Sequence, residues 1–599
     1  MRKTTHTLQQ GVTLIETLLG VAVIAIVGFG VARTYITLLQ IYSTTRVKIA
    51  ASALAGEQME LIRNMPYSQV GTMGGIPPGA VTQLQTLTRD GFTFSLFATV
   101  RNIDDPFDGT IGGNPNDLSP ADYKLVELVV TCTSCPGPEE ATFTSRVAPK
   151  NLETASQNGA LFVQAIDASG LFIQGATVQV INPNVNPAIN ITDVTNAQGM
   201  LQIVDVPPSA QLYEITVSKS GYSTSKTYAL GVNFNPVQPH ATVALQTVTQ
   251  ISFQIDRVGQ IALSGVTNTC APVGTIGVTM TGEKLIATNP DVPKYSQAHT
   301  IGASGNLTVS SLEWDTYALS FSSASQYLSG TIPNPPITLA PGGNQTVKAV
   351  MEPANPSALL VTVLDANTLL PLADAQVAIS RIGFDASLTT GRGFLRQTDW
   401  SGGSGQTEMG AANSYASDDG SIESLLFPGE IRLKEVASST FAVSGILESS
   451  TFNVGSPSSF YNLTFLPANQ PPDTGADSVR FQLATATTSN PATWNFLGPD
   501  GTAGTYYTPV NTNIPAAHTG DQYLRYRALL STASTTVTPS VADVAITFSS
   551  QCVPPGQVLF GGLTNANYTI TITRVGYQVA NDNAIVGTGW QEKTILMNP

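Results

Sequence analysis

After a short polar leader, the first 65 residues carry hydrophobic side chains at the spacing of one long helix. From Val12 to Ala32 nearly every side chain is apolar, and Glu16 is the only ionisable one. A helix of this length rises about 30 Å, which matches the hydrocarbon thickness of a bilayer. Apolar residues continue at spacings of three and four until Pro66 stops the pattern. We therefore predict one helix over residues 12–65, with its first half in a membrane and its second half covering a sheet.

Beyond this helix the hydrophobic period falls from about four to two. Strict alternation predicts three antiparallel strands within residues 66–156. They are F-T-F-S-L-F-A-T-V (92–100), Y-K-L-V-E-L-V-V-T (123–131) and A-T-F-T-S-R-V (141–147). The N-terminal part is thus predicted to be α+β, with a long transmembrane helix on an antiparallel sheet.

From residue 157 the chain is rich in Thr, Val and Asn, and its strand patterns repeat. The first copy, residues 157–248, opens with L-F-V-Q-A-I-D-A-S-G and closes with Y-E-I-T-V-S-K-S-G-Y. A weaker copy occupies residues 249–355. The third opens with L-L-V-T-V-L-D-A-N-T and closes with Y-T-I-T-I-T-R-V-G-Y near the C-terminus, so it is split into residues 356–382 and 551–599. Tandem all-β sandwiches are predicted from this pattern.

Residues 383–550 interrupt the third copy. Because the entropic cost of closing a loop grows only logarithmically with its length, a whole domain is tolerated at such a position. Alternating patterning between Gly-rich turns predicts a jelly-roll-like sandwich here. Its strand candidates are S-S-T-F-N-V, S-V-R-F-Q-L-A-T-A, T-W-N-F-L-G-P-D-G-T, Y-L-R-Y-R-A-L-L-S-T and V-A-D-V-A-I-T-F.

The N-terminal residues also resemble a known signal. A leader containing Arg2 and Lys3 ends at Gly11, and Glu16 is the fifth residue after it, as in type IV prepilins. That resemblance implies that residues 1–11 are a leader cut off by a prepilin peptidase and that Val12 becomes an N-methylated terminus. It also implies that Glu16 neutralises the amine of a neighbouring subunit during filament assembly. An ordinary signal anchor or secretory signal instead has its basic residues directly against the apolar run and a small-residue cleavage site after it.

Two further resemblances concern the rest of the chain. A-G-E-Q-M-E-L-I-R-N-M-P-Y (55–67) is similar to minor pilins and to pseudopilins of secretion systems. The repeats resemble carboxypeptidase-regulatory-like and collagen-adhesin B-type β-sandwiches. Collagen-adhesin modules often carry a Lys–Asn isopeptide bond. The opening strands of these copies contain no lysine, so we do not expect that bond here.

Composition narrows the possible partners. Charged residues make up only 11% of the 599 residues, and the formal net charge is −14. An acidic surface poor in lysine argues against nucleic acid as a partner. Four cysteines are too few for a disulfide scaffold, although an extracytoplasmic compartment permits pairing.

Two local clusters are candidate sites. Asp104, Asp105 and Asp108, joined by Asp117 and Asp122, supply the oxygen ligands that calcium prefers, as in some pseudopilins. Asx-type turns explain the same residues without a metal, and no other cofactor is expected. Cys132 and Cys135 lie at a hairpin end and form either a local disulfide or two free thiols.

Aromatic residues of the insert are candidates for a sugar-binding platform, with core packing as the alternative. They are Trp400, Trp494, Tyr506, Tyr507, Tyr523 and Tyr526. No nucleotide-binding loop, metalloprotease motif or nucleophile elbow occurs, and the four histidines are scattered. We therefore predict no catalytic residue and no enzyme activity.

Together these features predict a minor pilin or pseudopilin of a type IV pilus-like filament. We expect it in the cytoplasmic membrane as a single-pass protein before assembly, and on a pilus or at the cell surface afterwards. Its expected partners are the prepilin peptidase, other pilins, the membrane and a surface glycan or protein ligand. The alternatives are a minor pseudopilin of a type II secretion system and a membrane-anchored adhesin outside any filament.

Overall fold

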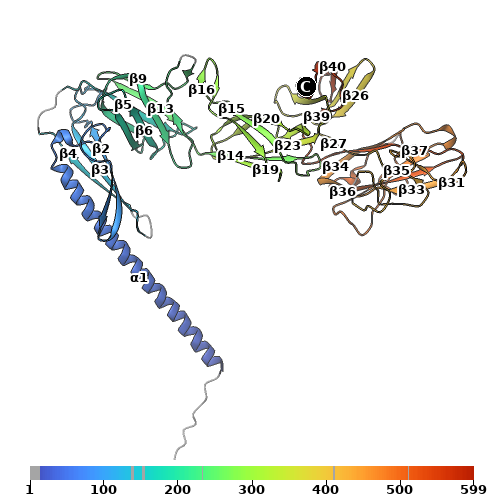
Figure 1. Ribbon diagram of the computed structural model, residues 1–599, viewed down its shortest axis with the longest axis horizontal. Coiled ribbons are helices and arrows are strands. Elements are labelled where there is room, and N and C mark those ends of the chain that lie inside the picture. The colour runs from blue at the N-terminus through green and yellow to red at the C-terminus, as the bar shows by residue number, and fades with distance from the viewer. Residues whose placement is uncertain (1–13, 136–139, 151–154, 232–233, 409–411, 510–511) are drawn as a thin grey trace, which may run out of the picture. The chain divides into compact units, whose positions relative to one another are not determined.

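The fold is described from a computed structural model. It covers residues 14–135, 140–150, 155–231, 234–408, 412–509 and 512–599. The predicted leader, Gly11 and Val12 lie outside these residues. One long N-terminal helix is followed by many β-sheets (Figure 1). The chain divides into two compact units: Met1–Asp256 with Ile286–Asp291, and Arg257–Leu285 with Val292–Pro599.

The first unit begins with helix α1 (Leu14–Arg63), 50 residues without a break. The predicted helix is thus confirmed, and Pro66 follows its end. A four-stranded antiparallel sheet comes next, in the order β1-β2-β3-β4. The three predicted strands are present, and β1 adds a fourth that its weaker pattern did not reveal. Their bounds are β1 (Leu84–Arg89), β2 (Phe92–Ile103), β3 (Tyr123–Cys132) and β4 (Glu140–Val147), with a short 3-10 helix η1 (Tyr67–Gln69) before them.

The C-terminal half of α1 shares one buried hydrophobic cluster with this sheet. Its small and apolar side chains, among them Ala50, Leu54 and Ala55, are buried with Leu96 and Leu128 of the central strands. The alternation of β2 and β3 puts every second residue into this cluster. The N-terminal half of the helix contributes nothing to it.

The first β-sandwich follows in the same unit. Its strands are β5 (Gly159–Ile166), β6 (Thr177–Asn182), β7 (Ile189–Val194), β8 (Met200–Val206), β9 (Ser209–Ser218), β10 (Ser225–Lys226), β11 (Asn235–Pro236), β12 (Ala241–Val243) and β13 (Val248–Gln254). Strand β13 pairs in parallel with β5 along its whole length. The predicted boundary after residue 248 is therefore too early, because the strand that completes this sheet lies beyond it.

The second unit starts with another sandwich, whose strands lie between residues 257 and 353. They are β14 (Gly259–Val266), β15 (Ile276–Gly282), β17 (Val292–Pro293), β18 (Ser296–Ile301), β19 (Asn306–Leu312), β20 (Asp315–Ser322), β21 (Gln326–Ile332), β22 (Ile337–Leu339) and β23 (Asn344–Pro353). Strand β16 (Leu285–Thr288) interrupts this series: it pairs with β11, and its residues from Ile286 onward belong to the first unit. The central strand β14 pairs antiparallel with β19 and parallel with β23.

The third sandwich is assembled from both ends of the remaining chain. Strand β24 pairs antiparallel with β39 and parallel with β42, and β25 pairs with β26 and β40. Its strands are β24 (Ala358–Asp365), β25 (Gln376–Arg381), β26 (Phe384–Thr389), β39 (Gln557–Phe560), β40 (Ala566–Thr573), β41 (Ala580–Val586) and β42 (Trp590–Met597). The predicted start of the insert at residue 383 is thus too early, because β26 belongs to the sheet of β25.

The central strands of all three sandwiches pair in the same way, which matches the sequence repeats, and the second sandwich has an additional strand, β21, beside β23. In each, the opening strand has one antiparallel and one parallel neighbour. Each also buries one tyrosine in the equivalent strand of the other sheet: Tyr213, Tyr317 and Tyr568. Each of these hydroxyls donates to a backbone carbonyl four to six residues earlier, at 2.6, 2.8 and 3.1 Å respectively.

The insert is largely antiparallel and has its own core. Its strands are β27 (Gly393–Gln397), β28 (Ser417–Asp418), β29 (Ile422–Glu423), β30 (Ile431–Leu433), β31 (Glu435–Ala437), β32 (Thr440–Phe441), β33 (Ser444–Glu448), β34 (Phe452–Leu466), β35 (Val479–Ala486), β36 (Asp521–Ser531), β37 (Ser540–Val541) and β38 (Asp543–Ser549). Strand β34 pairs with β36 through its first half and with β38 through its second. The predicted strand T-W-N-F-L-G-P-D-G-T is wrong, because no strand is assigned there. Turn η2 (Pro472–Thr474) and turn η3 (Ala516–His518) complete the insert.

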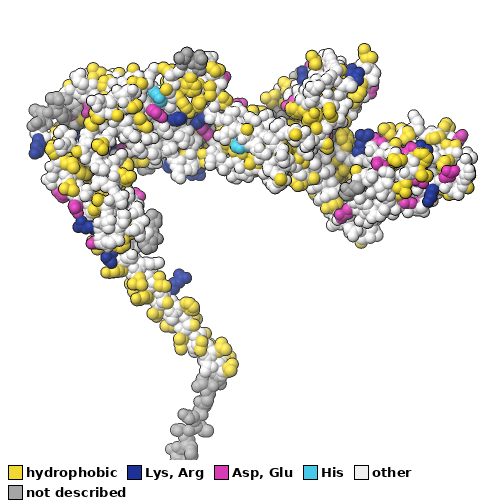
Figure 2. Space-filling model, in the orientation of Figure 1, with side chains coloured by type: hydrophobic (Ala, Val, Ile, Leu, Met, Phe, Trp, Pro, Cys, Tyr) yellow, Lys and Arg dark blue, Asp and Glu magenta, His cyan; other side chains and the backbone are white. Residues whose placement is uncertain are grey.

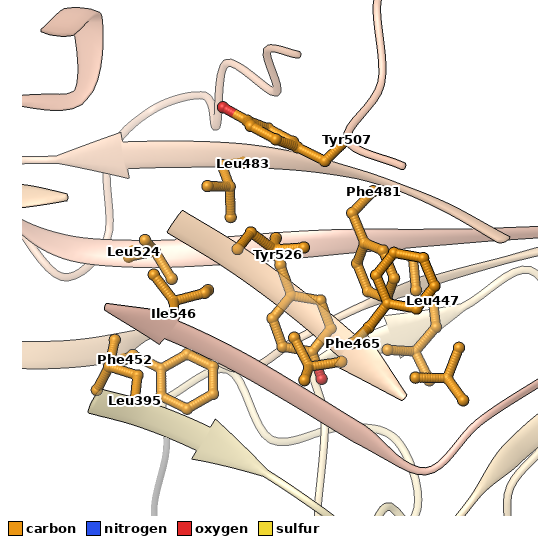
Figure 3. Close-up of a cluster of buried hydrophobic side chains, with 14 of the residues drawn as sticks. Leu395, Leu447, Phe452, Phe465, Phe481, Leu483, Tyr507, Leu524, Tyr526 and Ile546 are labelled. Carbon is orange, nitrogen blue, oxygen red and sulfur yellow. The ribbon is translucent and has the colours of Figure 1, made fainter. Parts of the chain in front are cut away.

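Tyr526 organises the centre of the insert's core. Its ring lies 6.1 Å from that of Phe452 and 5.8 Å from that of Phe481 (Figure 3). Its buried hydroxyl accepts a hydrogen bond from Trp400 Nε1 at 2.8 Å and donates one to Gln397 Oε1 at 2.6 Å. Because the polar atoms of this contact are paired, their hydrogen bonds offset the cost of removing them from water.

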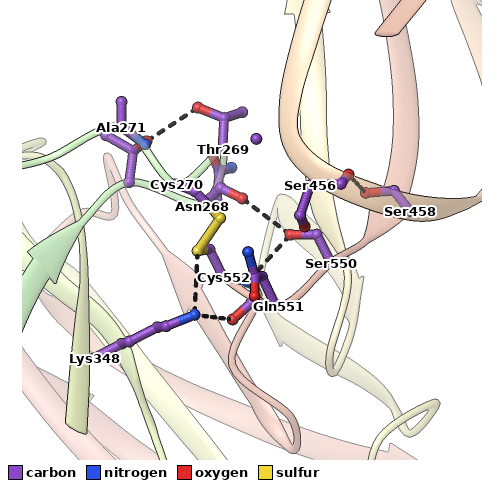
Figure 4. The surroundings of a disulfide bond; sticks show 12 residues. Asn268, Thr269, Cys270, Ala271, Lys348, Ser456, Ser458, Ser550, Gln551 and Cys552 are labelled. Carbon is purple, nitrogen blue, oxygen red and sulfur yellow. Dashed lines mark hydrogen bonds between the residues drawn. A yellow bond between two sulfur atoms is a disulfide. The ribbon is translucent and has the colours of Figure 1, made fainter. Parts of the chain in front are cut away.

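A disulfide between Cys270 and Cys552 joins parts of the second unit that are 282 residues apart in sequence. Lys348 Nζ donates to the carbonyl of Gln551 at 3.1 Å beside it (Figure 4). Ser550 Oγ donates to the carbonyl of Asn268 at 3.5 Å. A side chain at Gly455 of β34 would overlap the backbone at Thr269, so the insert lies directly against this connection.

The second and third sandwiches are also joined by buried polar contacts. The amide of Gln557, which is buried, accepts from Thr331 N at 2.9 Å and donates to the carbonyl of Thr331 at 3.3 Å. Trp590 Nε1 donates to the carbonyl of Leu328 at 2.8 Å. Breaking the Gln557 contact leaves buried polar atoms unpaired, so these sandwiches are held together by more than their linker.

Candidate functional site

The N-terminal half of α1 is the most conspicuous exposed apolar surface in the first unit. Within Thr17–Arg63 the most apolar window has a mean hydropathy of 1.9, and none of it is buried. Figure 2 shows yellow side chains along this half of the helix. By length and composition the helix can cross a membrane. Its large exposed hydrophobic residues include Leu14, Ile15, Leu18, Leu19, Ile24, Ile26, Phe29, Ile36, Leu38 and Ile41.

Glu16 lies one turn into this apolar segment. The next ionisable residue along the helix is Arg33, roughly 25 Å further along its axis at 1.5 Å per residue. A carboxylate placed in lipid costs several kcal/mol unless it is neutralised. Gly20, Gly28 and Gly30 interrupt neither the helix nor any packing contact within the chain.

The predicted calcium ligands lie in a loop between β2 and β3 that is closed by its own hydrogen bonds. Asp104 Oδ2 accepts from Ile111 N at 2.9 Å, and Asp105 Oδ1 accepts from Phe107 N at 3.2 Å. Asp108 is exposed. Burial and the neighbouring carboxylates of Asp117 and Asp122 raise the pKa of Asp104, against the effect of its bond to Ile111. Among the described residues no group of three or more Asp, Glu, His or Cys is arranged to hold a metal, and calcium stays a prediction.

Cys132 and Cys135 form the local disulfide that was one of the two alternatives for this pair. It closes the end of β3, where Ser134 Oγ accepts a hydrogen bond from Thr93 N of β2 at 2.8 Å. The bond therefore secures one end of the four-stranded sheet.

The structure separates the six candidate platform aromatics into two groups. Trp400, Tyr507 and Tyr526 are fully buried in the core, so they cannot contact a ligand. Trp494 and Tyr506 are half-buried beneath guanidinium groups: Arg525 lies 5.0 Å from the Trp494 ring and Arg480 lies 4.8 Å from the Tyr506 ring. Tyr523 is half-buried and lines a cavity. The six therefore do not form one platform.

Sequence patterns did not reveal the charged contact between the N-terminal sheet and the first sandwich. The guanidinium of Arg101 in β2 donates through two nitrogens to the carboxylate of Asp193 in β7. It also donates to Glu127 Oε2 at 2.6 Å. Nearby, the buried Lys124 Nζ donates to the carbonyl of Tyr67 at 2.8 Å, and burial lowers the pKa of Lys124 to about 8. A single charged residue in an alternating strand gives no signal of its distant partner.

His518 in the insert is buried with a defined tautomer. Thr485 Oγ1 donates its only proton to Asp521 Oδ2 at 2.6 Å, so it must accept from His518 Nδ1, which lies 3.0 Å away. Nε2 is buried and has no hydrogen-bond partner among the described residues. Burial lowers the pKa of His518, and the charge of Asp521 only partly opposes this.

We expect the insert to lose stability as the pH falls below about 6.5, the ordinary pKa of histidine. The unfolded chain then takes up a proton that the folded site resists, so the free energy of unfolding falls by at most about 1.4 kcal/mol per pH unit. His518→Asn keeps a donor near Nδ1 and should remove this slope between pH 7 and 5. Urea unfolding followed by the fluorescence of Trp400 and Trp494, with Trp314 and Trp590 replaced by Phe, measures it. An unchanged slope in His518→Asn would assign the effect to other groups.

Comparison with known proteins gives only distant similarities to solved structures. No protein-family model matches the sequence, and no characterised protein matches it significantly. The TIE protein of Bacillus anthracis is 12% identical over 52% of this chain and 66% of its own, with a TM-score of 0.15. A streptococcal ancillary pilin is 11% identical over 37% and 75%, with a TM-score of 0.18. GBS52, the minor pilin of Streptococcus agalactiae, is 13% identical over 33% and 96%, with a TM-score of 0.18. TM-scores this low carry no argument, so the function has to be argued from this chain's own residues.

Proposed function

We propose that the chain is a minor pilin or pseudopilin of a type IV pilus-like filament. One observation carries the proposal: a single unbroken helix has two halves that need different partners. The second half is buried with its own antiparallel sheet, while the first half exposes a continuous apolar surface. A bilayer covers that surface before assembly, and the equivalent helices of neighbouring subunits cover it in a filament.

The sandwiches then form an extracytoplasmic part that serves adhesion or a role at the filament tip. A chain with this much mass beyond the helix suits a subunit used once or a few times rather than along a whole filament. The buried contacts of Gln557 and the disulfide of Cys270 and Cys552 support this use, because they hold neighbouring sandwiches together outside the cell. The proposal assigns no enzymatic activity to the chain.

Processing of the N-terminus provides the first test. We expect a prepilin peptidase to cut after Gly11 and leave an N-methylated Val12, because Gly11 separates a polar leader from an apolar helix. Gly11→Leu should leave the leader attached, since a bulky residue blocks a site built for glycine. Mass spectrometry of the N-terminal peptide from membranes measures both. Gly20→Leu, a glycine inside the same apolar run, is the control and should be cut normally.

A mature terminus beyond Ala32 would instead identify a cleaved secretory signal and overturn the proposal. Shearing of surface fibres from the cells then distinguishes a filament subunit, a membrane-anchored adhesin and a pseudopilin. A filament subunit appears in sheared fibres, whereas an adhesin that stays in the membrane does not. A pseudopilin of a secretion system is lost from the membrane fraction only when that system's assembly ATPase is present.

A further inference from the structure

A cavity of about 470 Å³ lies in the second unit between the insert and the connection from β14 to β15. Its walls come from six separate segments. They are Thr269 of that connection, Leu395 of β27, Glu408, the adjacent residues Thr451, Phe452 and Asn453 around the start of β34, Ser489 between β35 and β36, and Tyr523 of β36. This volume is within the range of small-ligand sites, roughly 300–1,000 Å³.

Two polar side chains that line this cavity, Asn453 and Glu408, have hydrogen-bonding atoms available for a ligand. Asn453 Oδ1 accepts from Gly455 N at 2.8 Å and from Gln522 Nε2 at 3.0 Å, which holds the side chain in place and leaves Nδ2 as a donor. The carboxylate of Glu408 makes no ion pair with any residue described in the structure. Thr451 Oγ1 is already used, because it accepts from Arg525 Nε at 2.8 Å. The lining of the cavity therefore includes a fixed amide donor and a charged acceptor.

Two aromatic residues and Leu395 of β27 provide the apolar part of the site. Phe452 is 6% exposed and belongs to the core, so it can only form the floor. Tyr523 is half-buried, and its Oη accepts from Gln522 Nε2 at 3.4 Å, which fixes the ring at one end. An aromatic face beside hydrogen-bonding groups suits a ligand that is apolar on one side and hydroxylated at its edge.

The charges of the residues that line the cavity further restrict the class of ligand. The lining contains one carboxylate and no Lys, Arg or His. Arg525 lies behind Thr451, but its guanidinium is occupied by Thr451 Oγ1 and by the carbonyl of Thr407, and it faces the Trp494 ring. An anionic ligand would therefore meet repulsion without compensation.

From this combination we infer that the cavity binds a neutral saccharide. The Tyr523 ring stacks on the apolar face of a pyranose, while Glu408 accepts from its hydroxyls and Asn453 Nδ2 donates to one of its oxygens. The inference adds a ligand class to the adhesive role proposed above and rests on that role for its biological meaning. The binding itself needs neither a membrane nor a filament.

The test is saturation-transfer NMR and calorimetry on the full chain with four probes: lactose, maltose, cellobiose and diacetylchitobiose. The protein is kept in a zwitterionic detergent, because maltoside detergents are themselves saccharides. We expect saturable binding of at least one probe. Tyr523→Ala and Glu408→Gln should each weaken it by about tenfold or more, since each removes a principal contact. Glu408 is exposed, so its substitution should leave folding intact.

Tyr506→Ala is the matched control. Tyr506 is another half-buried tyrosine of the insert, lies against Arg480 and does not line the cavity, so its loss should leave saccharide binding unchanged. Sialyllactose should bind less well than lactose to the unaltered protein, and Glu408→Gln should narrow this difference. No binding of any of the four probes would overturn the inference, as would binding that survives both Tyr523→Ala and Glu408→Gln. Either failure leaves the processing and shearing results of the filament proposal untouched.

Discussion

A Glu16→Gln variant is expected to insert and to be cleaved normally, yet to be nearly absent from sheared filaments. Glutamine keeps the size and hydrogen bonding of the side chain and removes only its charge. Membrane insertion should be unimpaired, because transferring an uncharged amide into lipid costs less free energy than transferring a carboxylate. Cleavage should also be unimpaired, because the change is five residues beyond Gly11.

Assembly is expected to be impaired, because no Lys or Arg follows Glu16 in the sequence before Arg33. Arg33 is far along the helix axis, so in the proposed filament the free amine of a neighbouring processed subunit is the expected partner of Glu16. Removing one member of a buried ion pair leaves the other charge uncompensated, at a cost of roughly 3–5 kcal/mol. The variant should therefore accumulate in the cytoplasmic membrane.

Immunoblots of sheared and membrane fractions measure this distribution. Glu60→Gln is the control: Glu60 is on the same helix but exposed, and its ion pair with Arg63 at 3.1 Å is a surface contact worth little. It should assemble like the unaltered protein. If Glu16→Gln appears in sheared filaments at the unaltered level, Glu16 is not an assembly residue.

Replacing Cys270 and Cys552 together by alanine should lower the free energy of unfolding of the second unit by roughly 3–5 kcal/mol. The two cysteines are 282 residues apart, so their bond removes a large part of the unfolded chain's freedom. The loop that it closes contains most of the second sandwich, the first strands of the third and the whole insert. Loss of this disulfide also removes a covalent restraint beside the close approach of Gly455 to the backbone of Thr269.

The bond of Cys132 and Cys135 provides an internal control. These residues are only three positions apart, so the loop is short and the same double substitution should have a much smaller effect. Urea unfolding of both double variants, each with and without reductant, separates the two bonds. Peptide mapping without reduction should recover the Cys270–Cys552 pair from protein exported to an oxidising compartment. Two free thiols at these positions, or equal effects of both double variants, would contradict the expectation.

Much of the fold could be predicted because it depends on local patterns. The period of four over residues 14–63 and the period of two in β2 and β3 are properties of neighbouring residues, and each of these elements formed as predicted. The module edges were less predictable. Strands β13 and β26 were assigned to the wrong neighbours, because strand pairing depends on a partner far away in sequence. The candidate sugar platform failed for the same reason, since composition does not tell an inward-facing Trp400 from a cavity-lining Tyr523.

By itself, the sequence determined the long helix, the position of Glu16 within it, the repeats and the split of the third sandwich, because periodicity and repetition are written along one dimension. Only the tertiary structure decided that Cys270 pairs with Cys552, that Arg101 meets Asp193, and that Glu408, Asn453 and Tyr523 line one cavity. Each of these is a contact between residues that are far apart in the sequence. Such contacts depend on how strands pair and how sheets pack, so they cannot be predicted from a pattern along the chain.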